Sequence, residues 1–438
     1  MATSSSKKSV LIVGGGVFGT STAYHLSTRG YTDITVLDRF DAPSKDSAAA
    51  DLNKVVRADY PNPLYARLGL EAMSVWKDEK HPIFSGMYRE TGWIMGGHEK
   101  TKPWLQSSYE TAKEVGRKGV EFLGVPAIQA RWPSLTGAFD GWTNLWSPAA
   151  GWVPSGQALL RMANAARANG VKYRCGDAGY AKRLAYDSVT GACIGAITAD
   201  STLYKADLVV VATGANTATL IPEAGREAVA QCSAICVMQL TDEEAKKYKD
   251  IPIIEDFEQA IFFPPDENNM IKLCSCRCLT NYNNKHVPGA SILHSLGDYP
   301  YDGCPKEVED EMRAFVADVA PELKDRPFIS TKMCWDALAG DLNFRICPFP
   351  ERQNLFVATI GSNHGFKFLP VIGKYIADML EGSLGQEWQD LWQWKHGKIP
   401  EDFKDPHPYP LRDLSTLTGW QEKHVPGRGK MPWTWSRL

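Results

Sequence analysis

Three glycines close to the N-terminus have the spacing that a nucleotide phosphate requires. Gly14, Gly16 and Gly19 stand in the run Gly-Gly-Gly-Val-Phe-Gly, directly after the apolar residues 10–13. The first glycine allows a tight turn, the second lets the backbone approach a pyrophosphate, and the third lets a helix pack closely on a strand. Asp38 follows a second apolar run and can accept hydrogen bonds from ribose hydroxyls. These residues predict a dinucleotide site, with a plain glycine-rich turn as the alternative.

The elements around the glycines predict a β-α-β unit with further strands of the same parallel sheet. Short continuous apolar runs are typical of strands buried on both faces. We expect strands at 10–13, 34–37, 208–212 and 355–358 and a helix at 20–29, ended by Gly30. Thr213-Gly214 gives a second backbone approach far along the chain. A site so near the N-terminus with such a second approach is the arrangement of FAD enzymes of the glutathione-reductase type.

The fold class is therefore α/β, a Rossmann-like FAD-binding domain with a second, mixed or antiparallel-sheet substrate domain. Apolar residues at 262–265 and 271–274 predict strands of that second sheet. A chain of 438 residues is long enough for two or three domains at roughly 150 residues each. We expect the FAD domain to comprise 1–60, 145–235 and 330–385, the substrate domain 61–144 and 236–329, and a surface tail 386–438.

Composition narrows the class of protein. The net charge of -3 creates no broad positive field for nucleic acid or an anionic membrane, and no apolar run approaches the ~20 residues of a membrane helix. Ten cysteines without a secretory leader fit a reducing compartment. The C-terminal Ser436-Arg437-Leu438 is close to the Ser-Lys-Leu peroxisomal signal. We expect a peroxisomal, otherwise cytoplasmic, monomer that meets an import receptor, a small substrate and O2.

Two motifs in the last third of the chain resemble the monomeric sarcosine oxidase family. They are Cys334-Trp335-Asp336 and the run Gly-Ser-Asn-His-Gly-Phe-Lys-Phe at 361–368. The similarity spans nearly the whole chain and is greatest to the fungal branch, which includes amadoriases and saccharopine, pipecolate and N-alkyl amino acid oxidases. The resemblance implies an FAD-dependent oxidase of a carbon–nitrogen bond, whose products are an imine and hydrogen peroxide.

The resemblance and the glycine motif together give a set of expected cofactor residues. The set is Gly14, Gly16, Val17, Phe18, Gly19, Asp38, Arg39, Ser47, Asp51, Asn53, Lys54, Thr213, Gly214, Cys334, Asp336, Gly361, Gly365, Phe366 and Lys367. In the family, the cysteine matching Cys334 is joined through sulfur to the 8α-methyl of FAD. The alternative for Cys334 is a buried small hydrophobic residue.

The resemblance also places the groups that would carry the chemistry. Arg57 and Lys367 match cations that hold a substrate carboxylate, and Cys276 is expected beside the substrate. Lys272 matches the oxygen-activating lysine, and its position in an apolar strand makes a lone charge costly without a purpose. Lys54 is a second candidate near the flavin. For Arg57 and Lys367 a solvated surface cation is the alternative, and for Lys54 a surface salt bridge.

The sequence departs from fructosyl amino acid oxidases at two places. Those enzymes carry an Asp-Glu pair where this chain reads Ser275-Cys276, and they lack an arginine at the position of Arg57. Both departures favour a substrate recognised by its own α-carboxylate, such as saccharopine, pipecolate or an N-methyl amino acid. An amadoriase remains the nearest alternative. A nicotinamide-dependent dehydrogenase and a non-catalytic flavin-binding protein are alternatives of other classes.

Two smaller interpretations concern the same region. Cys274, Cys276 and Cys278 alternate, so on one strand they would share a face; we expect a thiol-lined strand rather than a metal site. Arg277 and His364 are candidates to line the pocket, with a structural role equally open for each.

Overall fold

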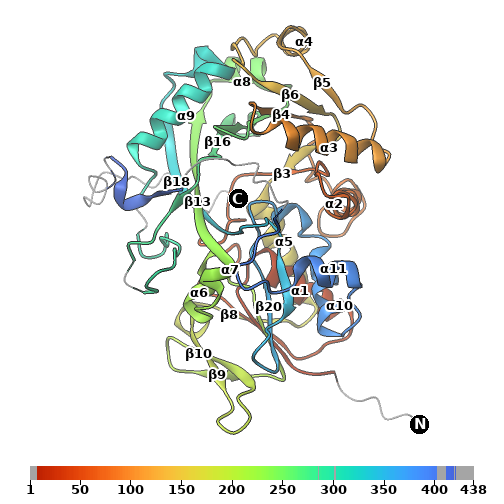
Figure 1. Ribbon diagram of the computed structural model, residues 1–438, viewed down its shortest axis with the longest axis vertical. Coiled ribbons are helices and arrows are strands. Elements are labelled where there is room, and N and C mark those ends of the chain that lie inside the picture. The colour runs from red at the N-terminus through yellow and green to blue at the C-terminus, as the bar shows by residue number, and fades with distance from the viewer. Residues whose placement is uncertain (1–6, 285, 300–301, 402–410, 419, 421–438) are drawn as a thin grey trace.

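The computed structural model describes residues 7–284, 286–299, 302–401, 411–418 and 420. Two large sheets contain most strands of the described chain: a six-stranded sheet, here called the lower sheet from its place in Figure 1, and a ten-stranded upper sheet. The long strands β13 (Ala228–Gln239) and β18 (Phe328–Ala339) run from the upper sheet toward the lower one (Figure 1). Among the described residues, no helix is long and apolar enough to cross a membrane.

The lower sheet has six strands and carries the glycine turn. Its order is β19 (Arg345–Pro348), β20 (Leu355–Thr359), β12 (Leu208–Val211), β1 (Val10–Val13), β2 (Ile34–Leu37) and β8 (Lys172–Arg174). All neighbours are parallel except β19 and β20. The central strand β1 lies between β12 and β2, with Val10 in register with both Leu208 and Ile34. Segments far apart in the sequence therefore meet at the carboxyl ends of these strands.

The strands of this sheet are apolar throughout because both faces are covered. Val10 and Ile12 belong to the core shared with the helices, whereas Leu11 and Val13 pack with residues of a three-stranded antiparallel sheet. The covering elements are α1 (Val17–Thr28), α5 (Ser155–Ala168) and α10 (Ile372–Leu380) on one side, and β9 (Ala181–Tyr186), β10 (Cys193–Thr198) and β11 (Leu203–Lys205) on the other.

The upper sheet has ten strands and is mostly antiparallel. Along it lie β21 (Arg412–Asp413), β17 (Leu279–Thr280), β13, β16 (Met270–Ser275), β15 (Ala260–Phe262), β14 (Ile253–Asp256), β4 (Trp93–Gly97), β6 (Thr143–Ser147) and β5 (Glu121–Leu123), with β18 paired to β13. Only β14–β4 and β17–β21 are parallel among the described pairs of this sheet. Its core packs against α9 (Lys306–Val319), whose buried face includes Val308, Met312 and Phe315.

The remaining elements connect or flank these sheets. The helices are α2 (Pro63–Trp76), α3 (Lys102–Glu114), α4 (Val125–Arg131), α6 (Thr217–Leu220), α7 (Ala224–Glu227), α8 (Asp242–Tyr248) and α11 (Gln386–Trp392), and a two-stranded ribbon pairs β3 (Lys54–Val56) with β7 (Gly151–Val153). Short 3-10 turns lie at Gly176–Ala178, Gly214–Asn216, Pro321–Leu323, Phe366–Phe368 and Leu414–Thr416.

Several expected elements are confirmed and three details are wrong. The strands at 10–13 and 34–37 have the expected bounds, but the helix begins earlier, at Val17, because Gly16 already ends the turn. The expected strand 262–265 is wrong: β15 ends at Phe262, before two prolines that cannot donate to a ladder. The tail is not confined to the surface, since Trp392 of α11 is fully buried.

Candidate active site

A large cavity of about 2120 Å³ is lined by residues of both sheets. Typical ligand pockets hold roughly 300–1,000 Å³, so this one has room for a dinucleotide together with a small substrate. The expected site residues that line it are Gly14, Gly16, Val17, Phe18, Asp38, Arg39, Ser47, Lys54, Arg57, Thr213, Gly214, Lys272, Cys276, Cys334, Asp336, Gly361, Gly365, Phe366 and Lys367. Gly19, Asp51 and Asn53 do not line the cavity but stand behind residues that do.

The turn between β1 and α1 requires glycine for steric reasons. Gly14 has φ +108°, and a Cβ there would lie 2.4 Å from the carbonyl oxygen of Ala212 at the end of β12. A Cβ on Gly19 would lie 1.9 Å from the carbonyl oxygen of Gly14. Gly16 is the N-cap of α1, and Gly16, Val17 and Phe18 at the start of this helix line the cavity. This cradle fits the pyrophosphate of a dinucleotide.

Asp38, at the end of β2, also supports the turn. Its carboxylate accepts hydrogen bonds from the backbone N–H groups of Gly15 at 2.8 Å and Phe40 at 2.9 Å. Burial raises the pKa of Asp38, although these N–H donors oppose the shift. The neighbouring Arg39 bonds Asp298 at 2.8 Å. Both side chains line the cavity, where a ribose could use the remaining acceptor capacity of Asp38.

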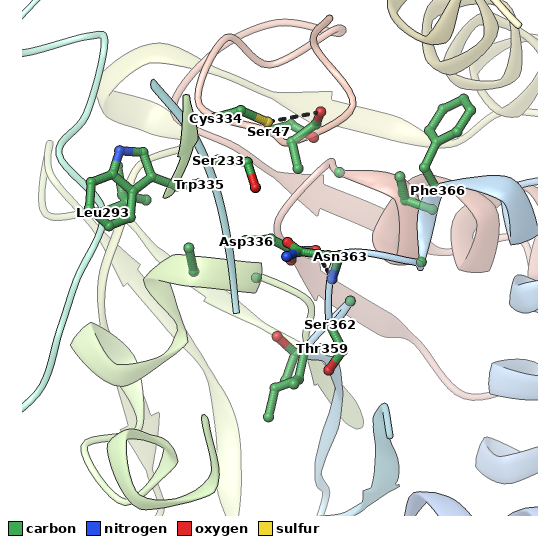
Figure 2. Close-up of a pocket in the computed structure, with 18 of the residues that line it drawn as sticks. Ser47, Ser233, Leu293, Cys334, Trp335, Asp336, Thr359, Ser362, Asn363 and Phe366 are labelled. Atoms are coloured by element: carbon green, nitrogen blue, oxygen red, sulfur yellow. Dashed lines mark hydrogen bonds between the residues drawn. The ribbon is translucent and has the colours of Figure 1, made fainter. Parts of the chain in front are cut away.

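A strained loop after β20 forms another wall. Ile360, Ser362 and Asn363 all have positive φ, at 65°, 48° and 62°, which costs energy for residues with a side chain. Asp336 on β18 supports the loop by accepting a hydrogen bond from the N–H of Asn363 at 2.9 Å. Figure 2 shows Asp336 and Asn363 facing each other across the gap between β18 and this loop. Such strain is typical of segments that approach a ligand closely.

Cys334 lies on the same strand as Asp336 and also lines the cavity (Figure 2). The ammonium of Lys54 approaches its Sγ at 3.5 Å, and the thiol faces the carbonyl oxygen of Ala48 at 3.6 Å. The cysteine is thus a buried thiol beside a cation, open to the cavity on one side. In that position the sulfur can react with a ligand in the cavity, whereas the sulfur of a fully enclosed core cysteine cannot.

A buried charge cluster joins Lys272, Lys54 and Asp51. The Lys272 side chain is 1% exposed, and its Nζ lies 2.6 Å from Asp51 Oδ2 and 2.6 Å from the carbonyl oxygen of Asn53. Lys54 Nζ lies 2.9 Å from the same carboxylate oxygen. Burial alone would raise the pKa of Asp51, but the two ammonium groups hold it well below its usual value. One carboxylate therefore neutralises two cations incompletely, and a positive charge remains beside the cavity.

The pKa values of the two lysines shift in opposite directions. Burial lowers the pKa of Lys272 despite Asp51, whereas the carboxylate raises the pKa of Lys54 well above its usual value against the effect of burial. The Lys272 ammonium also faces the ring of Phe263 at 4.6 Å. Asp51 and Asn53 thus position cations, which explains why they stand behind the cavity wall.

Arg57 and Lys367 come together around Tyr60. The guanidinium of Arg57 lies over the Tyr60 ring at 4.3 Å and donates to the carbonyl oxygen of Asp59. Lys367 Nζ donates to the Tyr60 hydroxyl at 3.0 Å and to the carbonyl oxygen of His364 at 2.8 Å. Burial first, and then the charge of Arg57, lowers the pKa of Lys367 well below its usual value. A carboxylate bound beside Arg57 and Lys367 would oppose this shift and favour the charged form of the lysine.

His364 lines the cavity and extends this network. Its Nε2 lies 2.8 Å from the carbonyl oxygen of Leu342, so Nε2 carries the proton, and Nδ1 accepts from the Tyr60 hydroxyl at 3.2 Å. Burial, and next the charge of Lys367, lowers the pKa of His364 well below its usual value, which keeps the ring neutral. A continuous chain of hydrogen bonds therefore runs from Lys367 through Tyr60 to His364 and fixes the lysine.

Sequence reasoning missed Tyr60, described above, and a buried acidic residue, Glu255. It is the third residue of β14, is 7% exposed and lines the cavity. Burial raises its pKa to about 7, although the charges of Arg57 and Lys367 oppose the shift. The only signal in the sequence is an acidic residue directly after the apolar run Ile-Pro-Ile-Ile. No spacing rule connects it with Arg57 or Lys367.

The cysteine interpretation needs a correction. β16 ends at Ser275, so Cys276 and Cys278 are not on a strand with Cys274 and the three do not form one strand face. Cys274 and Cys276 line the cavity, and burial raises the pKa of Cys274 to about 12. Arg277 does not line the cavity; its Nε donates to the carbonyl oxygen of Glu258 at 2.9 Å. Among the described residues, no cluster of three or more His, Cys, Asp or Glu side chains could hold a metal.

Comparison with known proteins identifies the family. The family model described as DAO, FAD dependent oxidoreductase, matches residues 9–379. The chain belongs to this family. Over 425 residues it is 34% identical to the L-saccharopine oxidase of Schizosaccharomyces pombe, covering 91% of this chain and 95% of that protein. It is 23% identical over 380 residues to a monomeric sarcosine oxidase of a Bacillus species, covering 84% and 91% of the two chains.

Solved structures share the fold. A modified fructosyl peptide oxidase from Aspergillus nidulans matches with a TM-score of 0.86 at 31% identity, over 95% of this chain and all of that one. Amadoriase II from Aspergillus fumigatus matches with a TM-score of 0.84 at 29% identity, over 94% and 97% of the two chains. The protein is thus an FAD-dependent oxidoreductase, and the glycine cradle is the part of it that fits the FAD pyrophosphate. The nicotinamide alternative is not supported.

Proposed function

We propose that this FAD-dependent oxidase acts on the carbon–nitrogen bond of an amino acid carrying a secondary amine. Saccharopine, pipecolate, sarcosine and other N-methyl amino acids are the substrate class. When bound, FAD accepts a hydride from the carbon next to nitrogen at N5 and passes the electrons to O2, giving H2O2. The resulting imine is hydrolysed by water to an amine and a carbonyl.

The observation that carries this proposal is the pair Arg57 and Lys367 around Tyr60. Both cations line the cavity that the glycine cradle opens into, and Lys367 is 4% exposed. A substrate carboxylate would take the place between them, with Arg57 able to bond it through two N–H groups and Lys367 as a compact point charge. Anchoring by a carboxylate fixes the reacting carbon, and such positioning lowers the barrier. The relation to an L-saccharopine oxidase supports an acidic substrate.

Lys272 is assigned to the oxygen half of the reaction. Oxygen takes up electrons one at a time, and a fixed cation stabilises the negative charge that develops on it. Lys272 is held by Asp51 and Asn53 at the cavity wall, so its position does not depend on substrate. Lys54 shares the same carboxylate and adds positive charge on the side of Cys334.

Cys334 is proposed to hold FAD covalently. Sulfur would bond to the 8α-methyl carbon with loss of the thiol hydrogen and one methyl hydrogen, and O2 would accept the two electrons to give H2O2. The support is the position of the thiol, which lines the cavity with its Sγ 3.5 Å from the Lys54 ammonium. Acid precipitation tests the bond: the yellow colour should stay with the polypeptide.

An oxygen-consumption screen over N-alkyl and cyclic amino acids tests the function. Free acids should react and their methyl esters should not, because an ester offers no charge to Arg57 and Lys367. Fructosyl-valine and fructosyl-lysine belong in the same screen, since the structural similarity to fructosyl peptide oxidase favours sugar amines as a second candidate. Equal turnover of esters and acids would exclude binding of a substrate carboxylate by Arg57 and Lys367, and it would favour an amadoriase activity.

The proposal extends to the cellular setting. We infer import into peroxisomes through Ser436-Arg437-Leu438, a segment outside the described residues, and action as a monomer. A compartment that removes H2O2 suits an oxidase. Deletion of the three residues should leave a tagged protein in the cytosol, and light scattering should give the mass of one chain.

A further inference from the structure

Glu255 lies in the upper sheet and lines the same cavity as Arg57 and Lys367. Strand β14 lies between β4 and β15, where Glu255 is in register with Met95 and Ile261. Phe257, Ile261 and Phe263 line the cavity around it. A carboxylate at 7% exposure among apolar neighbours is expensive to bury unless it gains partners.

The partners present do not satisfy this carboxylate. Its side-chain hydrogen bond among the described residues comes from the thiol of Cys276, with Sγ 3.8 Å from Oε1, and a thiol is a weak donor. No Lys, Arg or His nitrogen of the described chain lies within the 4.0 Å of an ion pair, although the Arg57 and Lys367 charges act on it from farther away. The cavity thus contains two cations for an anionic group and one carboxylate for a cationic group.

The titratable groups that act most strongly on Glu255 come from several elements. Arg57 follows β3, Lys367 lies in the turn 366–368 and Cys276 follows β16. Asp256 on its own strand opposes the ionised form, and His98 after β4 bonds Asp256 at 2.9 Å. The balance leaves the Glu255 pKa at about 7, raised mainly by burial. The group therefore exchanges its proton near neutral pH.

We propose that Glu255 binds the protonated nitrogen of the substrate and takes its proton. The inference rests on the proposed function and deepens it. A secondary amine reaches the enzyme mostly as the R2NH2+ ion, which has no lone pair to assist loss of a hydride from carbon. The nitrogen–hydrogen bond breaks, the proton passes to a Glu255 oxygen, and the neutral amine R2NH remains. A zwitterionic substrate thereby meets opposite charges at both its ends.

Two isosteric acids test the charge recognition without turnover. Glycine betaine and 3,3-dimethylbutanoate differ only by a cationic nitrogen in place of a carbon, and betaine has no lone pair to be oxidised. Binding is followed at pH 8 by the absorbance change of the bound flavin. Wild type should prefer betaine roughly ten- to a hundred-fold, and Glu255→Gln should bind the two equally. Glu258→Gln, three residues along and outside the cavity lining, is the matched control and should keep the preference.

The pH dependence tests the proton transfer. Glu255 is ionised above its pKa, so anaerobic flavin reduction at low substrate should rise about tenfold per pH unit below about 7 and level off above it. In Glu255→Gln the rise should continue to the amine's own pKa, measured by titration. The proposal is overturned if the change of slope near pH 7 in the rate of flavin reduction persists in Glu255→Gln. It is also overturned if wild type and Glu255→Gln prefer betaine to the same extent.

A further measurement covers the case in which Glu255→Gln does not retain FAD. In wild type the betaine preference should itself appear as pH rises through about 7, and a preference constant from pH 5.5 to 9 overturns the proposal. The binding experiments need no oxidation. A protein that prefers betaine but oxidises no amine would disprove the proposed function and leave the role of Glu255 as a cation-binding carboxylate standing.

Discussion

Asp51 offers the sharpest test of how the buried charges are arranged. Its Oδ2 lies 2.6 Å from Lys272 Nζ and 2.9 Å from Lys54 Nζ, and the Asp51 side chain is 4% exposed. At these separations each attraction is about 6 kcal/mol for an effective dielectric constant of 20. Desolvation of the three groups offsets much of that gain. Removing one partner of such a buried cluster costs roughly 3–5 kcal/mol.

Asp51→Asn should therefore lower the free energy of unfolding by about 3–5 kcal/mol at pH 7, measured by urea denaturation of the flavin-loaded protein. The Asp51 pKa is held below its usual value, so its contribution to stability exists above that usual value and is lost as pH falls through the lowered one. Asp250→Asn is the control, because Asp250 is 86% exposed and 3.9 Å from Lys249, and should change stability by less than about 0.5 kcal/mol.

The same substitution makes a kinetic prediction. Burial already lowers the Lys272 pKa, and the Asp51 carboxylate is the group that opposes this shift. Without it the ammonium should lose its proton at a lower pH, so reoxidation of the reduced enzyme by O2 should slow as pH rises. Stopped-flow mixing of reduced enzyme with O2 from pH 6 to 9 measures this. Identical reoxidation in Asp51→Asn and wild type at every pH would refute the reasoning that a charged Lys272 assists oxygen.

Four further substitutions test three parts of the site. Lys272→Met should slow reoxidation at every pH far more than it slows reduction by substrate; equal reoxidation rates in rapid-mixing traces would contradict the assignment. Cys334→Ala should release the yellow colour on acid precipitation, whereas wild type retains it, and loss of colour from wild type would exclude the covalent bond. Arg57→Ala and Lys367→Met should each weaken substrates and carboxylate inhibitors together by about 1.5–3 kcal/mol, roughly ten- to a hundred-fold. Arg67→Ala, at an exposed position, is the control for the removal of a cation. A variant that carries both Arg57→Ala and Lys367→Met and is as active as wild type would rule out carboxylate binding by these two residues.

Some parts of the site could be predicted because they depend on local sequence. Glycine is required at 14 and 19 because a Cβ there would meet backbone atoms of the adjacent strand or of the turn itself. The glycine motif therefore predicts the geometry of the turn. The assignment of Lys272 to a buried strand followed from the apolar residues on either side of it. Glu255 had no such signal, because its neighbours in the cavity come from segments that the sequence does not relate to it.

The β-α-β unit, the glycine turn and the family could be predicted without coordinates, because hydrophobic period, glycine spacing and short motifs are local properties of the chain. Which charged groups meet became evident from the three-dimensional arrangement alone. Lys272 and Asp51 are brought to 2.6 Å, and Lys367 is joined through Tyr60 to Arg57. These contacts, and the pKa of Glu255, depend on burial and on the mutual distances of groups from separate strands and loops. Such distances are set when the two sheets pack together, and no spacing along the chain specifies them.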